Sequence, residues 1–204
     1  MEGMLKRNIA WLSGSARGFS LVDQMLTLGL IGTLCAIAVP SLKNTIDGQR
    51  LGMESRAVER EIQLARLNAV TTNRPIRLRF NCPSAGYYRR VELIGSVNSP
   101  NLGDDADNRA AVRCNDATYP FPAADNDPIT KPNNDGPKMQ LNSKVTFGAT
   151  QTLEFWPNGT VHVYNAANAA WPYVSPATPV NIILTSAGVS RSVTVNVLGK
   201  TQIQ

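Results

Sequence analysis

The chain has 204 residues, of which 43% are hydrophobic, so there is room for one globular domain beside a membrane segment. The formal net charge of +5 would suit a nucleic-acid-binding protein, but residues 1–18 hold three cationic side chains and one acidic side chain, or +2 of that total. The remaining charge (5 − 2 = +3) is ordinary for a soluble surface and does not by itself indicate nucleic acid.

A basic segment ends at Gly18, and the next 21 residues, Phe19–Val39, contain a single charge. At about 1.5 Å per residue, a helix of this length spans roughly 30 Å, the thickness of a hydrocarbon core. A secretory signal has a shorter apolar region that is followed by its cleavage site, whereas here the polar segment stops before the apolar one begins. We therefore expect residues 19–40 to span a membrane.

The single charge in this run is Asp23. An acidic side chain at the centre of a spanning helix costs about 2.5–3.5 kcal/mol on insertion scales, and less near an end. The ten Phe, Leu, Ile and Val residues of the run contribute roughly −3 to −6 kcal/mol, so insertion survives this cost. Asp23 therefore either has a function within the membrane or simply lies at the membrane–water interface without one.

The combination of Gly18, Phe19, Asp23 and Pro40 resembles the type IV prepilin signal. The resemblance implies that prepilin peptidase removes the leader 1–18 after Gly18 and N-methylates Phe19, and that Asp23 meets the amino group of Phe19 during filament assembly. Most members have Glu at that position, and Pro40 stands where such helices commonly kink. The resemblance further implies a single-pass protein of the bacterial inner membrane. Because the leader is basic, we expect it to stay in the cytoplasm and the C-terminal part to lie in the periplasm.

Apolar residues continue at helical spacing after Pro40, which predicts an amphipathic helix over residues 41–73. Its stripe comprises Leu51, Val58, Ile62, Ala65 and Ala69. We expect this stripe to face a soluble head, residues 74–204. The helix should end at Asn73-Arg74-Pro75, because the residue before a proline disfavours the helical region.

The period then changes to two, with Ile76, Leu78 and Phe80 alternating with arginines, which is typical of a half-buried strand. Gly86–Leu93 is the expected partner strand. The two strands carry four arginines, Arg77, Arg79, Arg89 and Arg90. We interpret these as a solvent-exposed charged face, and a phosphate-binding patch is the alternative.

Residues 96–138 are crowded with Pro, Asn, Asp and Gly and are expected to form a long loop. Asp104, Asp105 and Asp107 lack the glycine and distal glutamate of a calcium loop, so we read them as solvated. Two cysteines, Cys82 and Cys114, lie in the exported part, where disulfides persist, and we expect them to be bonded. Two free buried thiols are the alternative.

Strands resume at Val145–Phe147, Thr152–Trp156 and Val161–Tyr164, the last two joined by a Pro157-Asn158-Gly159 turn. Asn158 also starts a glycosylation sequon, although the turn alone accounts for Asn-Gly. After a second loop, residues 165–179, two strictly alternating runs predict a closing antiparallel pair around Ser186-Ala187-Gly188. These runs contain Val180, Ile182 and Leu184, then Val193, Val195 and Val197.

A long helix followed by antiparallel strands resembles the type IV pilin fold, an α+β class in which the helix packs on a β-sheet head. The segments 153–160, 182–185 and 191–200 resemble the GspH/FimT-type branch of minor pilins and pseudopilins. That branch ends its last hairpin in Gly-Arg, where this chain has Gly199-Lys200. Because lysine lacks the planar fork of arginine, DNA contact through Arg191 and Lys200 is expected to be weak.

The resemblance implies a non-catalytic minor pilin that acts in pilus assembly or initiation at the filament tip, with major and minor pilin subunits as partners. The alternatives are a pseudopilin of a type II secretion system and a DNA-binding minor pilin for DNA uptake. No nucleophile–base pair is recognisable, and His162 is expected to be structural. We expect no cofactor. We also expect no metal site, because the sole histidine stands alone in the sequence and no two cysteines have the spacing of metal ligands.

Overall fold

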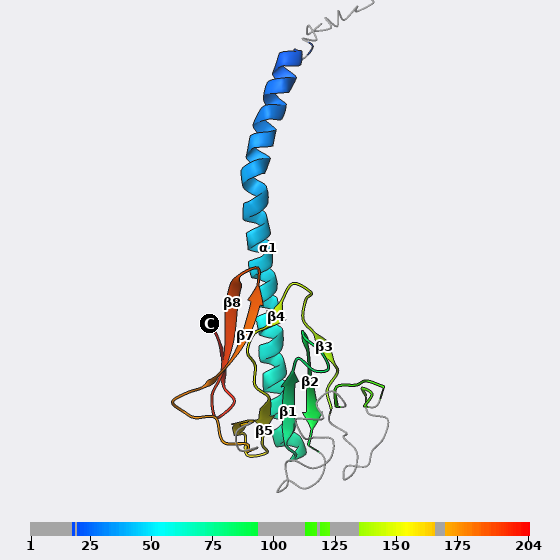
Figure 1. Ribbon diagram of the computed structural model, residues 1–204, viewed down its shortest axis with the longest axis vertical. Helices are drawn as coiled ribbons and strands as arrows, with labels where there is room; N and C mark the ends of the chain where they lie inside the picture. Colours follow the sequence, from blue (N-terminus) through cyan, green and yellow to red (C-terminus); the bar gives the residue numbers. More distant parts are fainter. Residues whose placement is uncertain (1–17, 19, 94–112, 118, 123–134, 166–169) are drawn as a thin grey trace, which may run out of the picture. The chain divides into compact units, whose positions relative to one another are not determined.

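The computed structural model describes residues 18, 20–93, 113–117, 119–122, 135–165 and 170–204. The chain divides into two compact units, Met1–Lys43 and Asn44–Gln204. The helix α1 (Leu21–Thr72) contributes to both units, and strands follow it in the second unit (Figure 1). The expected α+β class is confirmed.

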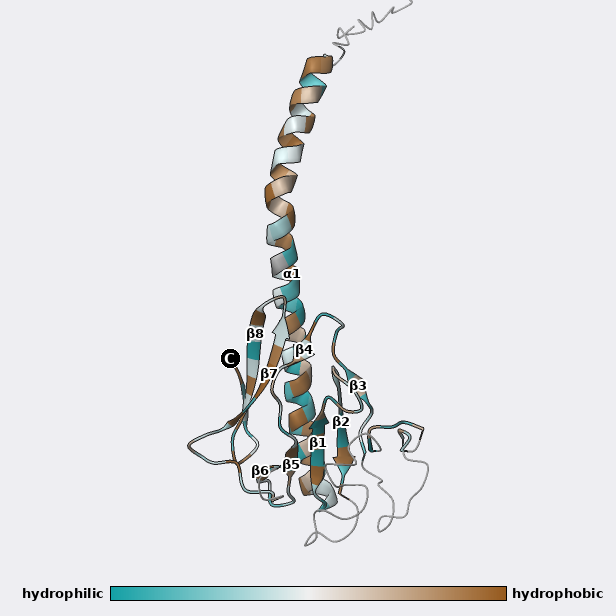
Figure 2. Ribbon diagram, viewed as in Figure 1, coloured by the Kyte–Doolittle hydropathy of each residue, from teal (hydrophilic) through white to brown (hydrophobic). Residues whose placement is uncertain are grey.

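The first unit contains the apolar part of α1. The large apolar side chains are exposed there; Leu21, for example, is 73% exposed and Leu42 is 61% exposed. Figure 2 shows this part coloured mostly brown and white, which marks apolar and weakly polar residues. By length and composition α1 could cross a membrane. The helix continues through Pro40 without ending.

In the described part of the second unit, nine strands form two antiparallel sheets. The first sheet has the order β3-β2-β1-β5-β6, from β1 (Ile76–Phe80), β2 (Tyr87–Glu92), β3 (Met139–Gln140), β5 (Leu153–Phe155) and β6 (Val161–Val163). The second sheet has the order β4-β7-β8-β9, from β4 (Thr146–Phe147), β7 (Val180–Ser186), β8 (Val189–Val195) and β9 (Thr201–Ile203). Six of the seven expected strands lie within two residues of their predicted bounds, and β8 begins four residues before the predicted run at Val193. Neither β3 nor β9 was predicted.

The core of the second unit lies between the second half of α1 and both sheets. The predicted helix stripe is buried in full, with Leu51 1% exposed and the other four residues fully buried. It packs with Ile76 and Leu78 of β1, Phe155 of β5 and several valines of β7 and β8. The alternating apolar residues of the strands therefore face the helix, as their period predicts.

Two backbone features confirm a predicted helix end and a predicted turn. Asn73 follows the last residue of α1 with a φ of 54°, a left-handed conformation that asparagine tolerates better than most residues. Ala187 and Gly188 connect β7 to β8 with φ angles of 50° and 82°. Positive φ at both central residues matches the right-handed twist of the flanking strands, which favours the closing hairpin.

Candidate functional site: the apolar helix and the disulfide cluster

Of the four residues of the predicted processing and assembly signal, three are described. Gly18 precedes α1 and is exposed, Asp23 lies in the first turn of α1, and Pro40 lies inside the helix. Phe19 lies outside the described residues. A negative charge in the first turn is favourable, because the N-terminus of a helix carries a partial positive charge. This position gives Asp23 a local stabilising role besides the one that the resemblance implies.

The predicted disulfide between Cys82 and Cys114 is present, with Cα atoms 5.6 Å apart. It is buried, since Cys82 is 2% exposed and Cys114 is not exposed. Cys82 lies two residues after the end of β1, while Cys114 lies 32 residues further along the chain. The bond thereby ties the segment around Cys114 to the first sheet. The remaining cysteine, Cys35, is free and exposed on the apolar part of α1.

The four arginines of the β1–β2 hairpin correct the sequence interpretation, because they are buried rather than exposed to solvent. Arg77 and Arg89 have no exposed surface, Arg79 is 1% exposed and Arg90 is 9% exposed. They also do not form a phosphate-binding patch. The guanidinium groups of Arg77, Arg89 and Arg90 bind groups of the protein itself.

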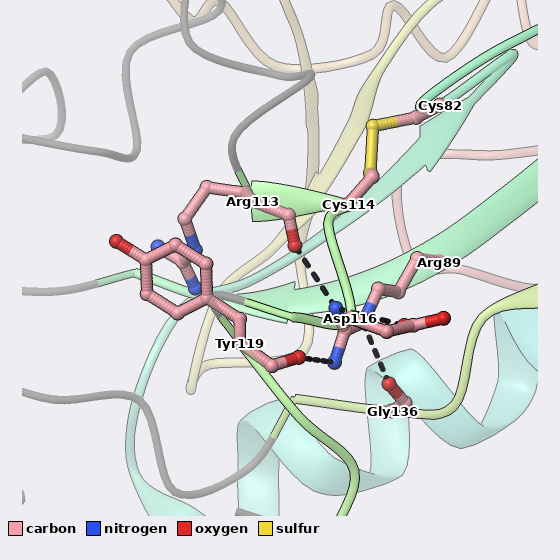
Figure 3. Close-up of a disulfide and its surroundings, with 7 residues drawn as sticks. All are labelled: Cys82, Arg89, Arg113, Cys114, Asp116, Tyr119 and Gly136. Carbon is pink, nitrogen blue, oxygen red and sulfur yellow. Dashed lines mark hydrogen bonds and ion pairs between the residues drawn. A yellow bond between two sulfur atoms is a disulfide. The ribbon is translucent and has the colours of Figure 1, made fainter.

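Arg89 of β2 is the centre of the cluster beside the disulfide (Figure 3). Its guanidinium donates to three backbone carbonyls, those of Gly136 at 2.8 Å, Arg113 at 3.1 Å and Tyr119 at 2.8 Å. Its Nη1 also lies 3.6 Å from the carboxylate of Asp116. Burial lowers the pKa of Arg89, while Asp135 and Asp116 act in the opposite direction.

Arg113 makes a second set of contacts, with the end of β2 and with Asp135. Its Nη2 donates to the carbonyl of Glu92 at 2.7 Å and to Oδ1 of Asp135 at 3.0 Å, and its guanidinium lies over the ring of Tyr119. Oδ1 of Asp135 also accepts the backbone N–H of Glu92 at 2.6 Å. Burial raises the pKa of Asp135, opposed by Arg113, by the Glu92 N–H and by Arg89.

A second polar row crosses β1, β5 and β6, where Arg77, Glu154 and His162 stand opposite one another. His162 has partners that the sequence did not reveal. Its Nδ1 lies 2.8 Å from the carbonyl of Trp171. Its ring stacks on that of Trp156 and contacts that of Tyr173 at a tilt. The row is therefore covered by the segment that carries Trp171, not by solvent.

The candidate DNA contacts, Arg191 and Lys200, are both exposed but lie apart. Arg191 pairs with Leu184 on β7, and its guanidinium lies over Gly52 of α1. Lys200 stands in the turn between β8 and β9 and shares a pocket of about 490 Å³ with Arg66. At about 3.3 Å per residue, roughly five ladder positions separate the two along β8. The structure does not bring them to one phosphate.

The turn reading of Asn158 is confirmed, because its Oδ1 accepts from the N–H and the hydroxyl of Thr160 at 3.0 and 2.6 Å. Asp104, Asp105 and Asp107 lie outside the described residues. Among the residues that the structure does describe, no three His, Cys, Asp or Glu side chains are grouped so that they could hold a metal ion.

The chain matches the model of one protein family. The family described as type II transport protein GspH matches residues 54–199. A solved structure, the minor pseudopilin EpsH from the type 2 secretion system of Vibrio cholerae, is similar to this chain at 12% identity with a TM-score of 0.41. The match covers 76% of this chain and 96% of that one. No curated protein matches.

Proposed function

Because the chain belongs to the GspH family of type II transport proteins, we propose that it is a minor pseudopilin, a non-catalytic subunit of the pseudopilus of a type II secretion system. The family match over residues 54–199 is the observation that carries this proposal. It favours the pseudopilin, the alternative from the sequence, over a minor pilin at the tip of a pilus. The type IV prepilin signal is shared by both and does not separate them.

The apolar part of α1 supplies the physical reason for assembly. Eleven large apolar side chains between Leu21 and Leu42 are each 55–75% exposed in the isolated chain. Burying such a side chain contributes about 1.5–3 kcal/mol, so the segment requires lipid or the helices of other subunits around it. We propose that it first spans the inner membrane and then packs against other pilin-like helices, where small residues and van der Waals contact drive association.

The remaining parts of the proposal follow from the prepilin resemblance. The leader is removed after Gly18 by prepilin peptidase, Phe19 is methylated, and Asp23 pairs with the amino group of Phe19 in the filament. The second unit is periplasmic, which agrees with a disulfide, since such bonds persist outside the cytoplasm. DNA uptake has little support, because Arg191 and Lys200 lie apart.

Deletion of the gene tests the proposal, with secretion and piliation measured in the same strain. Loss of a protein secreted by the type II pathway, with surface pili retained and secretion restored by the parent gene, is the expected result. Loss of pili with normal secretion would instead favour the pilus function. Crosslinking of the full-length protein in membranes should in addition recover other pseudopilins.

A further inference from the structure

The backbones on both sides of the disulfide are held by hydrogen bonds that do not involve sulfur. The N–H of Cys82 donates to the carbonyl of Tyr87 at 3.1 Å, which fixes Cys82 at the end of the β1–β2 hairpin. The carbonyl of Arg113, which belongs to the peptide bond joining it to Cys114, accepts from Arg89 at 3.1 Å. Each cysteine therefore has a backbone contact beside it that is made without sulfur.

Arg89 can place the Cys114 segment because its fork reaches three carbonyls at once. These carbonyls, of Arg113, Tyr119 and Gly136, come from separate positions in the chain, and Figure 3 shows them around one guanidinium. Hydrogen bonds from a charged donor are stronger than those between neutral groups. A buried guanidinium would otherwise leave donors without partners, so its burial on β2 favours the seated segment.

We propose that Arg89 is a positioning residue for disulfide formation, which seats the Cys114 segment on β2 while Cys82 and Cys114 are still thiols. The thiols are then held with Cα atoms near the observed 5.6 Å, inside the range that a disulfide spans. A thiolate of one cysteine attacks a sulfur of an oxidant such as oxidised glutathione and releases one reduced glutathione. The thiolate of the other cysteine then displaces the second, so two thiols and one glutathione disulfide give the protein disulfide and two glutathiones.

The test measures the effective concentration of the two thiols by equilibrating the full-length protein, in detergent, with reduced and oxidised glutathione. The exposed Cys35 is replaced by Ser in all samples so that only the pair reports. Arg89→Lys keeps the charge but has no planar fork, and so loses the three-carbonyl contact. We expect the effective concentration to fall about tenfold or more in native buffer, as the loss of one charged hydrogen bond implies, and to equal that of the parent in strong denaturant.

The matched control is Arg77→Lys, which replaces an equally buried arginine on the neighbouring strand. The Arg77 guanidinium binds Glu154 and lies over Trp171, so this variant should leave the effective concentration close to the parent's. An unchanged value in Arg89→Lys would overturn the proposal. An equal fall in both variants would do the same, because it would report only general loosening of the fold.

If Arg89→Lys does not fold, hydrogen exchange on the full-length Cys82→Ser/Cys114→Ser protein decides the matter. The Gly136 amide donates to the carbonyl of Arg90, and the Tyr119 amide to that of Asn115. Both amides should remain protected without the disulfide if Arg89 seats the segment. Loss of protection at both, with the amides of β7 and β8 still protected, would show that the disulfide does the seating.

Discussion

The side chains of Arg77 on β1 and Glu154 on β5 lie with Nε and Oε2 2.6 Å apart, and neither side chain has any exposed surface. The two residues are direct partners in the ladder, so the ion pair follows from the register of the sheet. The other carboxylate oxygen of Glu154 accepts the indole N–H of Trp156 at 2.6 Å, and the guanidinium of Arg77 lies over the ring of Trp171. Each charge therefore has several partners, as a buried ion pair requires.

Removing one member of this pair should destabilise the second unit strongly. Arg77→Met leaves the Glu154 carboxylate buried without its counter-charge, and we expect a loss of about 3–5 kcal/mol in the free energy of unfolding. Arg77→Met/Glu154→Leu removes both charges and should recover most of that loss. Denaturant unfolding of the full-length protein in detergent measures both variants. A double variant no more stable than the single one would show that packing, not the uncompensated charge, causes the loss.

This pair also shows where prediction from the sequence stopped. The alternation of Ile76 and Leu78 with Arg77 and Arg79 predicted a strand with one apolar face, and that is what β1 has. The burial of the opposite face, which carries the arginines, could not be predicted from the periodicity of the strand. The residues that cover this face come from segments that have no periodicity of their own. Trp171 lies against Arg77, and Arg113 and Tyr119 lie against Arg89.

The disulfide was predictable for a different reason. Cys82 and Cys114 are the two cysteines outside the apolar run, so compartment and number selected the bond. Asp135 carried no such signal, since it is one of many Asp and Asn residues in a polar segment. Its burial depends on Arg113, and that contact joins two parts of a segment that the sequence shows only as a loop.

Asp135 should make the stability of the second unit depend on pH. Burial raises its pKa in the folded protein above the ordinary value of 3.8. Between that value and the folded pKa, the folded state binds more protons than the unfolded state. The contribution of Asp135 to the free energy of unfolding therefore falls as pH rises through this window, and it stays low above the folded pKa.

Asp135→Asn does not titrate but keeps an oxygen for the N–H of Glu92 and for Arg113. The stability of the parent relative to this variant should therefore fall as pH rises from about 4. Urea unfolding midpoints of both proteins, measured from pH 4 to 7 at constant salt, give this difference. Parallel midpoints would mean that burial and ion pairing with Arg113 cancel, and a difference that rises with pH would mean that ion pairing outweighs burial; either result contradicts the prediction.

The position of Gly18 before α1 leads to a prediction about processing. The mature protein should begin at Phe19 with a methylated amino group, and Gly18→Val should leave an unprocessed precursor in the membrane. Mass spectrometry of the intact N-terminus measures both. A chain beginning at Met1, or one beginning beyond Val39, would exclude the prepilin interpretation, since the apolar segment would then be uncut or lost.

Asp23 allows charge and length to be separated by two substitutions that leave the second unit unchanged. Asp23→Asn removes the charge at nearly constant size, and it lowers the cost of membrane insertion. If the carboxylate pairs with the Phe19 amine, this variant should insert at least as well as the parent yet enter filaments less. Asp23→Glu keeps the charge on a side chain one methylene longer and should assemble like the parent.

The measurement compares subunit incorporation, by quantitative mass spectrometry of sheared filaments, at equal abundance in the membrane. Position in the first turn of α1 complicates a simple reading, because the negative charge also favours the N-terminus of the helix by about 0.3–1 kcal/mol. Ser20→Asp/Asp23→Asn serves as the control, since it returns a negative charge to the start of the helix but not to position 23. If that control assembles as well as the parent, the helix terminus needs only a charge, and pairing at position 23 plays no part.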